Sequence, residues 1–232
     1  MDEALPATVE ELLGGPLLVL APHPDDESLG CGGLLAAAFA GAGAHVVCLT
    51  DGGFSHPGSR EWPKKRLAAL RRAELEAAVT ALGGGPADVT WLGLPDGALA
   101  GAPDPAEAIA RIAGGMGAAT LAVSSPLDPH GDHEAAAAIA ARVVAARPGL
   151  RLLYYPVWSR GMDGRAPAPE GTRARAFDAA PWAARKAAAI AAHPSQFGGV
   201  VTDDPGGFTF DADFARVLIE APEIYFEAPP WR

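Results

Sequence analysis

The sequence predicts an α/β protein with helices on both faces of a mostly parallel sheet. Apolar runs of strand length alternate with amphipathic stretches of helical length, as in successive βαβ units. The 232 residues are enough to bury one sizeable core, and the length does not require a second one. No internal repeat is present. We therefore expect a single domain over residues 1–232, folded as a Rossmann-like three-layer sandwich.

The first half of the chain supplies three expected strands and two expected helices. The strands are Leu17–Ala21, His45–Thr50 and Val89–Leu92. The first helix has Ser28 as a plausible N-cap and stops at Gly41, and the second runs from Lys64 to Leu82 with apolar residues at mostly helical spacing. Gly83–Gly85 closes the second helix.

The second half continues the same alternation. The expected elements are a helix at Pro105–Met116, a strand at Thr120–Ser124, a helix at Glu134–Ala146, a strand at Arg151–Tyr155 and a helix at Pro181–Ala192. Residues 162–170 are rich in Gly and Pro and predict a loop. The last forty residues mix apolar runs with Pro and Asp too irregularly to assign.

The overall charge restricts the class of partner. Lys and Arg number 18 against 28 Asp and Glu, which gives a formal net charge of −10. This charge repels phosphate backbones, so we expect no nucleic acid and no membrane as a partner, and a small-molecule substrate instead. Edge strands and abundant alanine are also compatible with a homo-oligomer.

Cysteine use and the N-terminal residues bear on localisation. Cys31 and Cys48 are the two cysteines, and both lie in segments expected to be buried, which favours reduced thiols in the cytoplasm. The start of the chain is acidic, and no apolar run approaches the roughly 18 residues that span a bilayer. We expect a cytoplasmic protein.

Two clusters of metal-binding residue types follow predicted strands. His23-Pro24-Asp25-Asp26 comes directly after Leu17–Ala21, and His130-Gly131-Asp132-His133 follows the strand at Thr120. The carboxyl ends of parallel strands meet at one edge of a sheet, so both clusters can reach one site. Neutral imidazoles and an ionised carboxylate suit a divalent transition ion, and His23, Asp26 and His133 can supply that set.

Each residue of the first cluster also has a simpler interpretation. His23 could be a capping or core histidine, and Asp25 with Asp26 could complement the helix macrodipole. Two clusters after two strands favour the metal. Adjacent carboxylates repel each other, so Asp25 is expected to have a task beside Asp26, and general base is that task. Glu27 would hold His23 in one tautomer, or be a solvated acid in the first helical turn.

The glycines of Gly30-Cys31-Gly32-Gly33 favour close packing over a cofactor. They lie too far beyond the strand for a dinucleotide-binding turn, so we expect them to let the helix approach the sheet or the site. No Ser or Cys stands in a recognisable nucleophile elbow, and Cys31 looks structural.

Several motifs follow one another in a characteristic order between about residues 16 and 197. The strongest are Pro22-His23-Pro24-Asp25-Asp26-Glu27 with Gly32-Gly33, and His130-Gly131-Asp132-His133. The weaker ones are Thr50-Asp51-Gly52, Arg71-Arg72-Ala73-Glu74, Leu82-Gly83, Leu92-Gly93-Leu94-Pro95-Asp96-Gly97, and Lys186 with His193-Pro194-Ser195-Gln196. Together they resemble the PIG-L family of deacetylases, also called LmbE-like proteins, which hydrolyse N-acetyl groups, commonly from N-acetylglucosamine derivatives.

The resemblance implies roles for individual residues. His23, Asp26 and His133 would be the metal ligands, and Asp25 the general base. His130 would stabilise the oxyanion or protonate the leaving amine. Gly131 stands where the family often has Pro, a departure that loosens the turn without removing a ligand. Asp132, like Glu27, is expected to support the ligands from behind.

The implied reaction is hydrolysis of an N-acetyl group on an amino-sugar conjugate. A bound divalent ion lowers the pKa of water toward ~7 and polarises the amide carbonyl. Zn²⁺ is the default ion, although Fe²⁺ or another divalent transition metal also suits these ligands. The alternatives are a metal-dependent amidase or esterase acting on a small non-sugar compound, and a catalytically silent carbohydrate-binding protein. A nucleotide-binding protein ranks third.

Sugar hydroxyls need hydrogen bonds and often an aromatic surface. The candidates for substrate binding are Arg71, Asp96, Trp158, Arg160 and Gln196. Some have alternatives that involve no substrate: Arg71 could pair with Glu74 on its own helix, Trp158 could belong to the core, and Gln196 could cap a helix.

Overall fold

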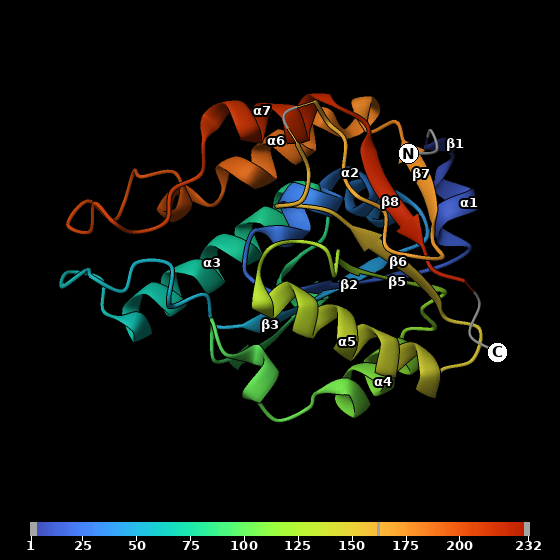
Figure 1. The fold of residues 1–232 in the computed structure, drawn as a ribbon, viewed down its shortest axis with the longest axis horizontal. Coiled ribbons are helices and arrows are strands. Elements are labelled where there is room, and N and C mark those ends of the chain that lie inside the picture. Colours follow the sequence, from blue (N-terminus) through green and yellow to red (C-terminus); the bar gives the residue numbers. More distant parts are fainter. Residues whose placement is uncertain (1–3, 162, 230–232) are drawn as a thin grey trace.

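The computed structural model describes residues 4–161 and 163–229, and these residues build one eight-stranded mixed sheet (Figure 1). Its strands are β1 (Leu5–Ala7), β2 (Leu17–Ala21), β3 (Ala44–Thr50), β4 (Val89–Leu94), β5 (Thr120–Ser124), β6 (Arg151–Tyr155), β7 (Arg173–Phe177) and β8 (Glu223–Glu227). Their order is β1-β7-β8-β6-β5-β2-β3-β4. The run from β6 to β4 is parallel, and β8 pairs antiparallel with both β6 and β7. The expected α/β fold with a mostly parallel sheet is confirmed.

Helices cover both faces of the sheet. One layer holds α1 (Val9–Leu13), α2 (Asp26–Ala40), α3 (Lys64–Leu82), α6 (Ala183–Ala191) and α7 (Ala212–Glu220), and the opposite layer holds α4 (Ala106–Gly115) and α5 (Gly131–Ala146) (Figure 1). Short 3₁₀ turns, η1 (Pro86–Asp88), η2 (Leu99–Gly101), η3 (Ala180–Trp182) and η4 (Pro194–Gln196), join these elements. In the described residues no helix has the length and apolar character needed to cross a membrane.

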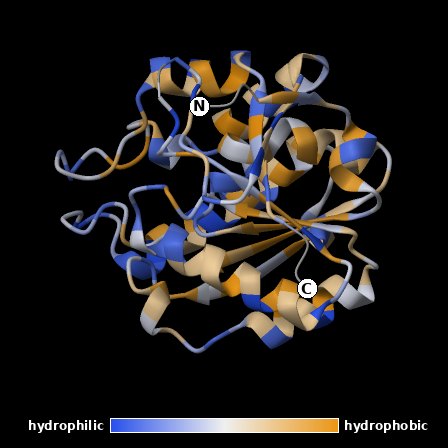
Figure 2. Cartoon of the chain, turned by 45° about the vertical axis from the view of Figure 1, so that its right-hand side comes forward, coloured by the Kyte–Doolittle hydropathy of each residue, from blue (hydrophilic) through white to orange (hydrophobic). Residues whose placement is uncertain are grey.

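The central strands are buried on both faces. Successive residues of β2 enter different cores: Leu17 and Val19 pack toward α2, whereas Leu18 and Leu20 pack toward α5. This alternation follows from the two-residue period of a strand, and burial on both faces is typical of parallel sheets. Figure 2 shows the strands as a mostly hydrophobic layer between the helices.

The glycines of α2 let this helix approach the sheet closely. A Cβ atom on Gly30 would overlap the ring of Tyr155 on β6, and one on Gly33 would lie 2.6 Å from the Cβ atom of Ala179. The Tyr155 hydroxyl also donates to the carbonyl oxygen of Leu20 at 2.8 Å. The packing interpretation of these glycines is therefore confirmed.

The connections diverge between β2 and β5. The chain leaves β2 through α2 on one face and leaves β5 through α5 on the other, although the two strands are hydrogen-bonded neighbours. A crevice opens at such a topological switch point, beyond the carboxyl ends of the strands. The two motif-bearing loops border this crevice.

Several expected boundaries were wrong. The first helix begins at Asp26 rather than after Ser28, and α5 begins at Gly131 rather than Glu134, because His130 is its N-cap. The expected strand at Val89 continues to Leu94, and the helix expected at Pro181 is divided into η3 and α6. The sequence analysis did not assign β1, α1, β7, α7 or β8. The three strands are defined by pairing with distant segments, whereas α1 and α7 are short helices with local N-caps at Thr8 and Asp211.

Candidate metal centre and active site

Side chains from the loops after five parallel strands line one cavity of about 410 Å³. Its wall includes His23 after β2, Phe54 after β3, Asp96 after β4, His130 after β5 and Trp158 after β6. The sheet thus brings together residues that lie far apart in the sequence. This cavity is where the candidate active site lies.

One carboxylate oxygen joins the two motifs. Oδ2 of Asp26 accepts the backbone N–H of His23 at 2.9 Å and lies 3.1 Å from its Nδ1 atom. The same oxygen lies 3.2 Å from Nε2 of His133. The structure therefore brings the three predicted ligands, His23, Asp26 and His133, to one point.

Other carboxylates hold the outer nitrogen of each imidazole. Nδ1 of His133 lies 2.9 Å from Asp128, and Nε2 of His23 lies 3.2 Å from Asp132 and 3.3 Å from Asp96. These contacts favour protonation of the outer nitrogens and leave the inner ones free to bind a cation, as is usual for metal-ligating histidines. Nε2 of His133 is buried and has no hydrogen-bond partner in the part of the chain that the structure describes. An unpartnered buried nitrogen facing a carboxylate fits a divalent metal.

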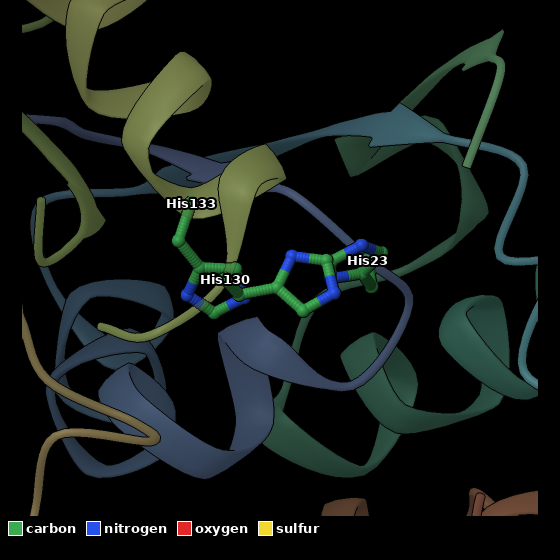
Figure 3. A group of neighbouring side chains, drawn as sticks. All are labelled: His23, His130 and His133. Atoms are coloured by element: carbon green, nitrogen blue, oxygen red, sulfur yellow. The ribbon is translucent and has the colours of Figure 1, made fainter. Parts of the chain in front are cut away.

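His130 completes a group of three imidazoles. Ligand atoms of His23, His130 and His133 lie within 4.8 Å of one another (Figure 3). The His130 ring is only half buried, however, and its Nδ1 atom accepts the backbone N–H of Asp132 at 3.2 Å. With Nδ1 engaged, neutral His130 carries its proton on Nε2. The ring is therefore better placed as a hydrogen-bond donor at the cavity wall.

A second acidic group surrounds the outer side of His23. Asp96 and Asp132 offer oxygens within 4.8 Å of the His23 ring. Asp132, however, accepts the backbone N–H groups of Gly97 and Leu99 at 2.8 and 2.9 Å. Its oxygens are thus already engaged, and it positions His23. A supporting role for Asp132 stays a prediction, and its contact with His23 is compatible with it.

The charges of the site favour a cation. Burial opposes protonation of both His23 and His133, but their carboxylate neighbours outweigh it and raise the pKa of His23 well above its usual value and that of His133 to about 9. Burial alone would raise the pKa of Asp26, yet the His133 and His23 rings hold it far below its ordinary range. The acidic cluster therefore stabilises positive charge at the point where the three ligands meet.

Asp25 has an unusual backbone conformation. With φ at 142°, it is the only non-glycine residue with positive φ in the part of the chain that the structure describes. Nη2 of Arg71 donates to the Asp25 carboxylate at 2.9 Å and to the carbonyl oxygen of Pro24 at 2.7 Å. Burial raises the pKa of Asp25 to about 7, against the lowering effect of Arg71. A carboxyl group with a pKa near 7 is suited to accept a proton at neutral pH.

The contacts of Arg71 and Glu27 decide between the alternatives left open for each of them. Arg71 does not pair with Glu74, which accepts the N–H and hydroxyl of Ser195 at 2.9 and 2.6 Å. Arg71 lines the cavity, but both terminal nitrogens are bonded to the protein. Glu27 is fully buried, so it is not a solvated acid, and its contacts are with the N–H of Asp25, Ser28 and His193 rather than with His23.

The remaining candidates for substrate binding divide into two groups. Asp96, Trp158 and Gln196 line the cavity. Oε1 of Gln196 is buried and has no hydrogen-bond partner among the described residues. Arg160 is not at the cavity wall, because its guanidinium donates to the carbonyl oxygen of Pro222 and helps to hold the C-terminal segment.

Several contributors to the site were not among the predicted site residues, and three of them show why. Asp128 orients His133, and its position two residues before His130 was the available signal. His193 lies 3.4 Å from Glu27 behind the first loop. Phe208 reaches the cavity wall from the C-terminal segment, where the sequence shows no regular pattern.

Comparisons with known proteins agree with this geometry. The model of the family described as PIG-L, GlcNAc-PI de-N-acetylase, matches residues 18–144, and the chain belongs to this family. A comparison with curated protein sequences gives no significant match.

Solved structures share the whole fold. N,N'-diacetylchitobiose deacetylase from Pyrococcus horikoshii is 20% identical with a TM-score of 0.71, over 93% of this chain and 84% of that one. A conserved protein from Thermus thermophilus is 26% identical with a TM-score of 0.66, over 93% and 96%. The 4-carboxy-2-hydroxymuconate hydratase GalB from Pseudomonas putida is 17% identical with a TM-score of 0.67, over 94% and 98%.

Proposed function

We propose that this protein is a metal-dependent hydrolase that removes an N-acetyl group from an amino-sugar conjugate. The observation that carries the proposal is the single oxygen of Asp26 within 3.2 Å of the inner nitrogens of both His23 and His133, directly beside Asp25. Membership of a de-N-acetylase family and the likeness to a chitobiose deacetylase support the same reaction.

His23, Asp26 and His133 would hold the metal, and Zn²⁺ is the default ion for two imidazoles and a carboxylate. When bound, such an ion lowers the pKa of water and polarises a carbonyl oxygen. The supporting contacts from Asp128 and Asp132 fix the ring orientations of the two histidines.

Asp25 is the proposed general base. It lies at the cavity wall next to Asp26, and its carboxylate is held by Arg71. With a pKa near 7 it can accept the proton of the attacking water and later pass it to the departing amine. The strained backbone of Asp25 keeps this carboxylate directed into the cavity.

His130 is the proposed oxyanion donor. Burial lowers the pKa of His130 below its usual value, and the charges of His23 and His133 lower it further. The ring is therefore neutral at pH 7. With Nδ1 accepting from Asp132, the Nε2 proton is free to donate to an oxygen in the cavity. A preorganised donor of this kind stabilises the charge that develops on the carbonyl oxygen.

Three further residues would contact the sugar. Trp158 offers an aromatic surface, and Asp96 and Gln196 offer acceptors for hydroxyl or amide protons. The cytoplasm is the proposed location, because Cys31 and Cys48 are both buried free thiols.

Metal analysis combined with an assay for newly freed amines tests the proposal. His133→Ala should lose the metal, whereas His130→Ala should keep it and lose about 10²- to 10³-fold in turnover. His45→Ala is the matched control, because His45 is bonded to Thr90 near the opposite end of the sheet. Its metal content and activity should be unchanged.

Other outcomes would favour other functions. Amine release from simple N-acyl compounds but not from N-acetylglucosamine conjugates would indicate the non-sugar amidase. A metal-loaded protein that releases no amine from any acyl compound would indicate a silent carbohydrate-binding protein. Full metal content in His133→Ala would show that the ligand set is wrong.

A further inference from the structure

The cavity wall away from the metal ligands is aromatic. Phe54, Trp158 and Phe208 line it from three separate loops. Phe54 is 58% exposed, so much of its ring is open to contact with a ligand in the cavity. We call these three side chains the aromatic wall.

Packing behind the cavity fixes two members of the aromatic wall. Trp158 meets Phe208 edge to face, with ring centroids 5.5 Å apart, and stacks on Phe210 at 5.0 Å. Phe210 in turn stacks on Phe214 of α7. Trp158 and Phe208 are therefore held in place before any ligand arrives, which reduces the entropy lost on binding.

The loops that carry Phe54 and Phe208 are tied to each other. The backbone N–H of Phe208 donates to the carbonyl oxygen of Ser55 at 2.8 Å. Asp203 accepts the hydroxyl of Ser59 at 2.6 Å, and Asp204 accepts the N–H of Gly58 at 2.8 Å. Segments about 145 residues apart in the sequence thus form one continuous rim.

The same cavity offers no free basic side chain. Among the described residues at its wall, Arg71 is the only Lys or Arg, and its terminal nitrogens are bonded to Asp25 and to the carbonyl oxygens of Pro24 and Gly52. Lys64, which packs beside the Phe54 loop, is paired with Asp51 at 3.3 Å.

Acidic groups border the space that a substrate would fill. Asp96 lies at the wall, where its Oδ1 atom is 3.3 Å from Nε2 of His23 and its Oδ2 atom accepts the backbone N–H of Phe54 at 2.8 Å. A phosphate or carboxylate on the substrate would lose its hydration without gaining an ion-pair partner, and it would face this like charge.

From the aromatic wall and the missing cation we infer that the preferred substrate is an uncharged N-acetylated sugar with an apolar, aromatic or alkyl aglycone, which packs on Phe54, Trp158 and Phe208. This inference rests on the proposed function. It predicts that this protein disfavours conjugates that carry a phosphate, such as the phosphoinositide in the family's description. It also predicts that the protein disfavours carboxylated compounds such as the substrate of the similar hydratase.

Three N-acetylglucosamine conjugates test the inference: the benzyl glycoside, the methyl glycoside and the 1-phosphate, with the freed amine measured in each case. The benzyl glycoside should exceed the methyl glycoside by about 10-fold in kcat/KM, because stacking and apolar burial of one ring are worth roughly one such factor. The 1-phosphate should fall at least about 10-fold below the methyl glycoside.

Variants of the rim show which side chain sets the preference. Phe54→Ala should reduce the ratio of benzyl to methyl activity to near one, and Phe54→Arg should raise activity on the 1-phosphate. Leu5→Ala is the matched control, because Leu5 is 61% exposed but lies on β1 at the edge of the sheet. It should leave the ratio as it is. An unchanged ratio in Phe54→Ala would overturn the role of Phe54.

Calorimetric binding to metal-free protein gives a readout that does not depend on turnover. The benzyl glycoside should bind more tightly than the methyl glycoside, and the 1-phosphate more weakly. If no conjugate releases an amine but this order of affinity holds, the proposed hydrolysis is wrong and the preference for an apolar aglycone stands. If the 1-phosphate is hydrolysed fastest, the inference is overturned and the hydrolase remains.

Discussion

The loops after β2 and β5 each deliver an imidazole to the same point, but the protein holds them in different ways. The first loop, residues 22–25, is buried and strained, and it depends on side chains from α3 and from the loop after α6. The second loop, residues 125–130, has no residue with positive φ; its Asp128 accepts the N–H groups of Val157 and Ser159, and its last residue, His130, caps α5. Both loops thus depend on distant parts of the chain, and the loop that carries the proposed base is the strained one of the two.

Asp25 shows why the first loop needs this support. A non-glycine residue with φ at 142° costs about 1–3 kcal/mol, so other contacts must hold it. Arg71 bonds its carboxylate and Glu27 accepts its N–H group at 3.0 Å. His130, at the equivalent place in the second loop, has an extended backbone with φ at −147° and no such strain.

The largest effect is expected from Asp25→Asn. Loss of a general base typically reduces turnover about 10²- to 10⁴-fold. Metal content should be unchanged, because the three ligands remain. Asp51→Asn, a change in an acid that pairs with Lys64 at the end of β3, serves as the control and should have little effect. Loss of metal in Asp25→Asn would show that Asp25 is a metal ligand and not a separate general base.

Arg71→Ala tests the bracing of the first loop. It leaves the buried carboxylate of Asp25 unpaired and should lower the free energy of unfolding by about 3–5 kcal/mol, measured by chemical denaturation. Arg72→Ala is the matched control on the same helix, because Arg72 forms an exposed pair with Glu76. It should cost no more than about 0.5 kcal/mol. Similar values for the two variants would mean that Arg71 is not a brace.

The helices that follow the two loops should respond differently to one added methyl group. Gly30→Ala forces a Cβ atom into the ring of Tyr155 and should cost about 1–3 kcal/mol of stability. Gly131→Ala meets no atom within 4 Å and should be neutral or stabilising by up to about 1 kcal/mol. Equal losses in thermal or chemical denaturation would contradict the difference in packing between α2 and α5.

The smallest effect is expected from His193, and it should appear in the pH dependence of stability. Burial lowers the pKa of His193, but Glu27 outweighs it and the net pKa is raised. Its contribution to stability, taken as the difference from His193→Gln, should be complete below about pH 6.5 and should decline as the pH rises through the folded-state pKa. His45, whose pKa is lowered by burial, should show the opposite trend. If the contributions of His193 and His45 to stability change with pH in the same direction, the pair of His193 with Glu27 does not stabilise the fold as proposed.

The sequence predicted those parts of the fold whose signals are local. The helix Lys64–Leu82 was predicted correctly because its apolar residues keep a helical spacing and Gly83 ends it in a left-handed conformation. The strands β2 and β6 were correct because each is a short apolar run between turn residues. By contrast, β8 begins with Glu223, which is fully buried because Lys186 of α6 pairs with it at 2.7 Å and the backbone of α2 also donates to its carboxylate. No local pattern indicates such a strand.

The candidate site shows the same division between local sequence signals and long-range contacts. The sequence could place His23, Asp26 and His133 near one point because each follows the end of a strand, and the topology of a parallel sheet brings these ends together. The support of Asp25 by Arg71, the contact of Glu27 with His193, and the aromatic wall depend on segments that meet only in the folded chain.

The sequence by itself determined the α/β architecture, the two motifs and the family, since these depend on periodicity and on residue types at short spacing. Only the tertiary structure decided which nitrogen of each histidine faces the shared carboxylate, which groups hold Asp25 in its strained conformation, and which surface remains for the rest of the substrate. Hydrogen bonds and packing act over a few ångströms in space, whereas the residues that make them here are separated by tens of positions along the chain.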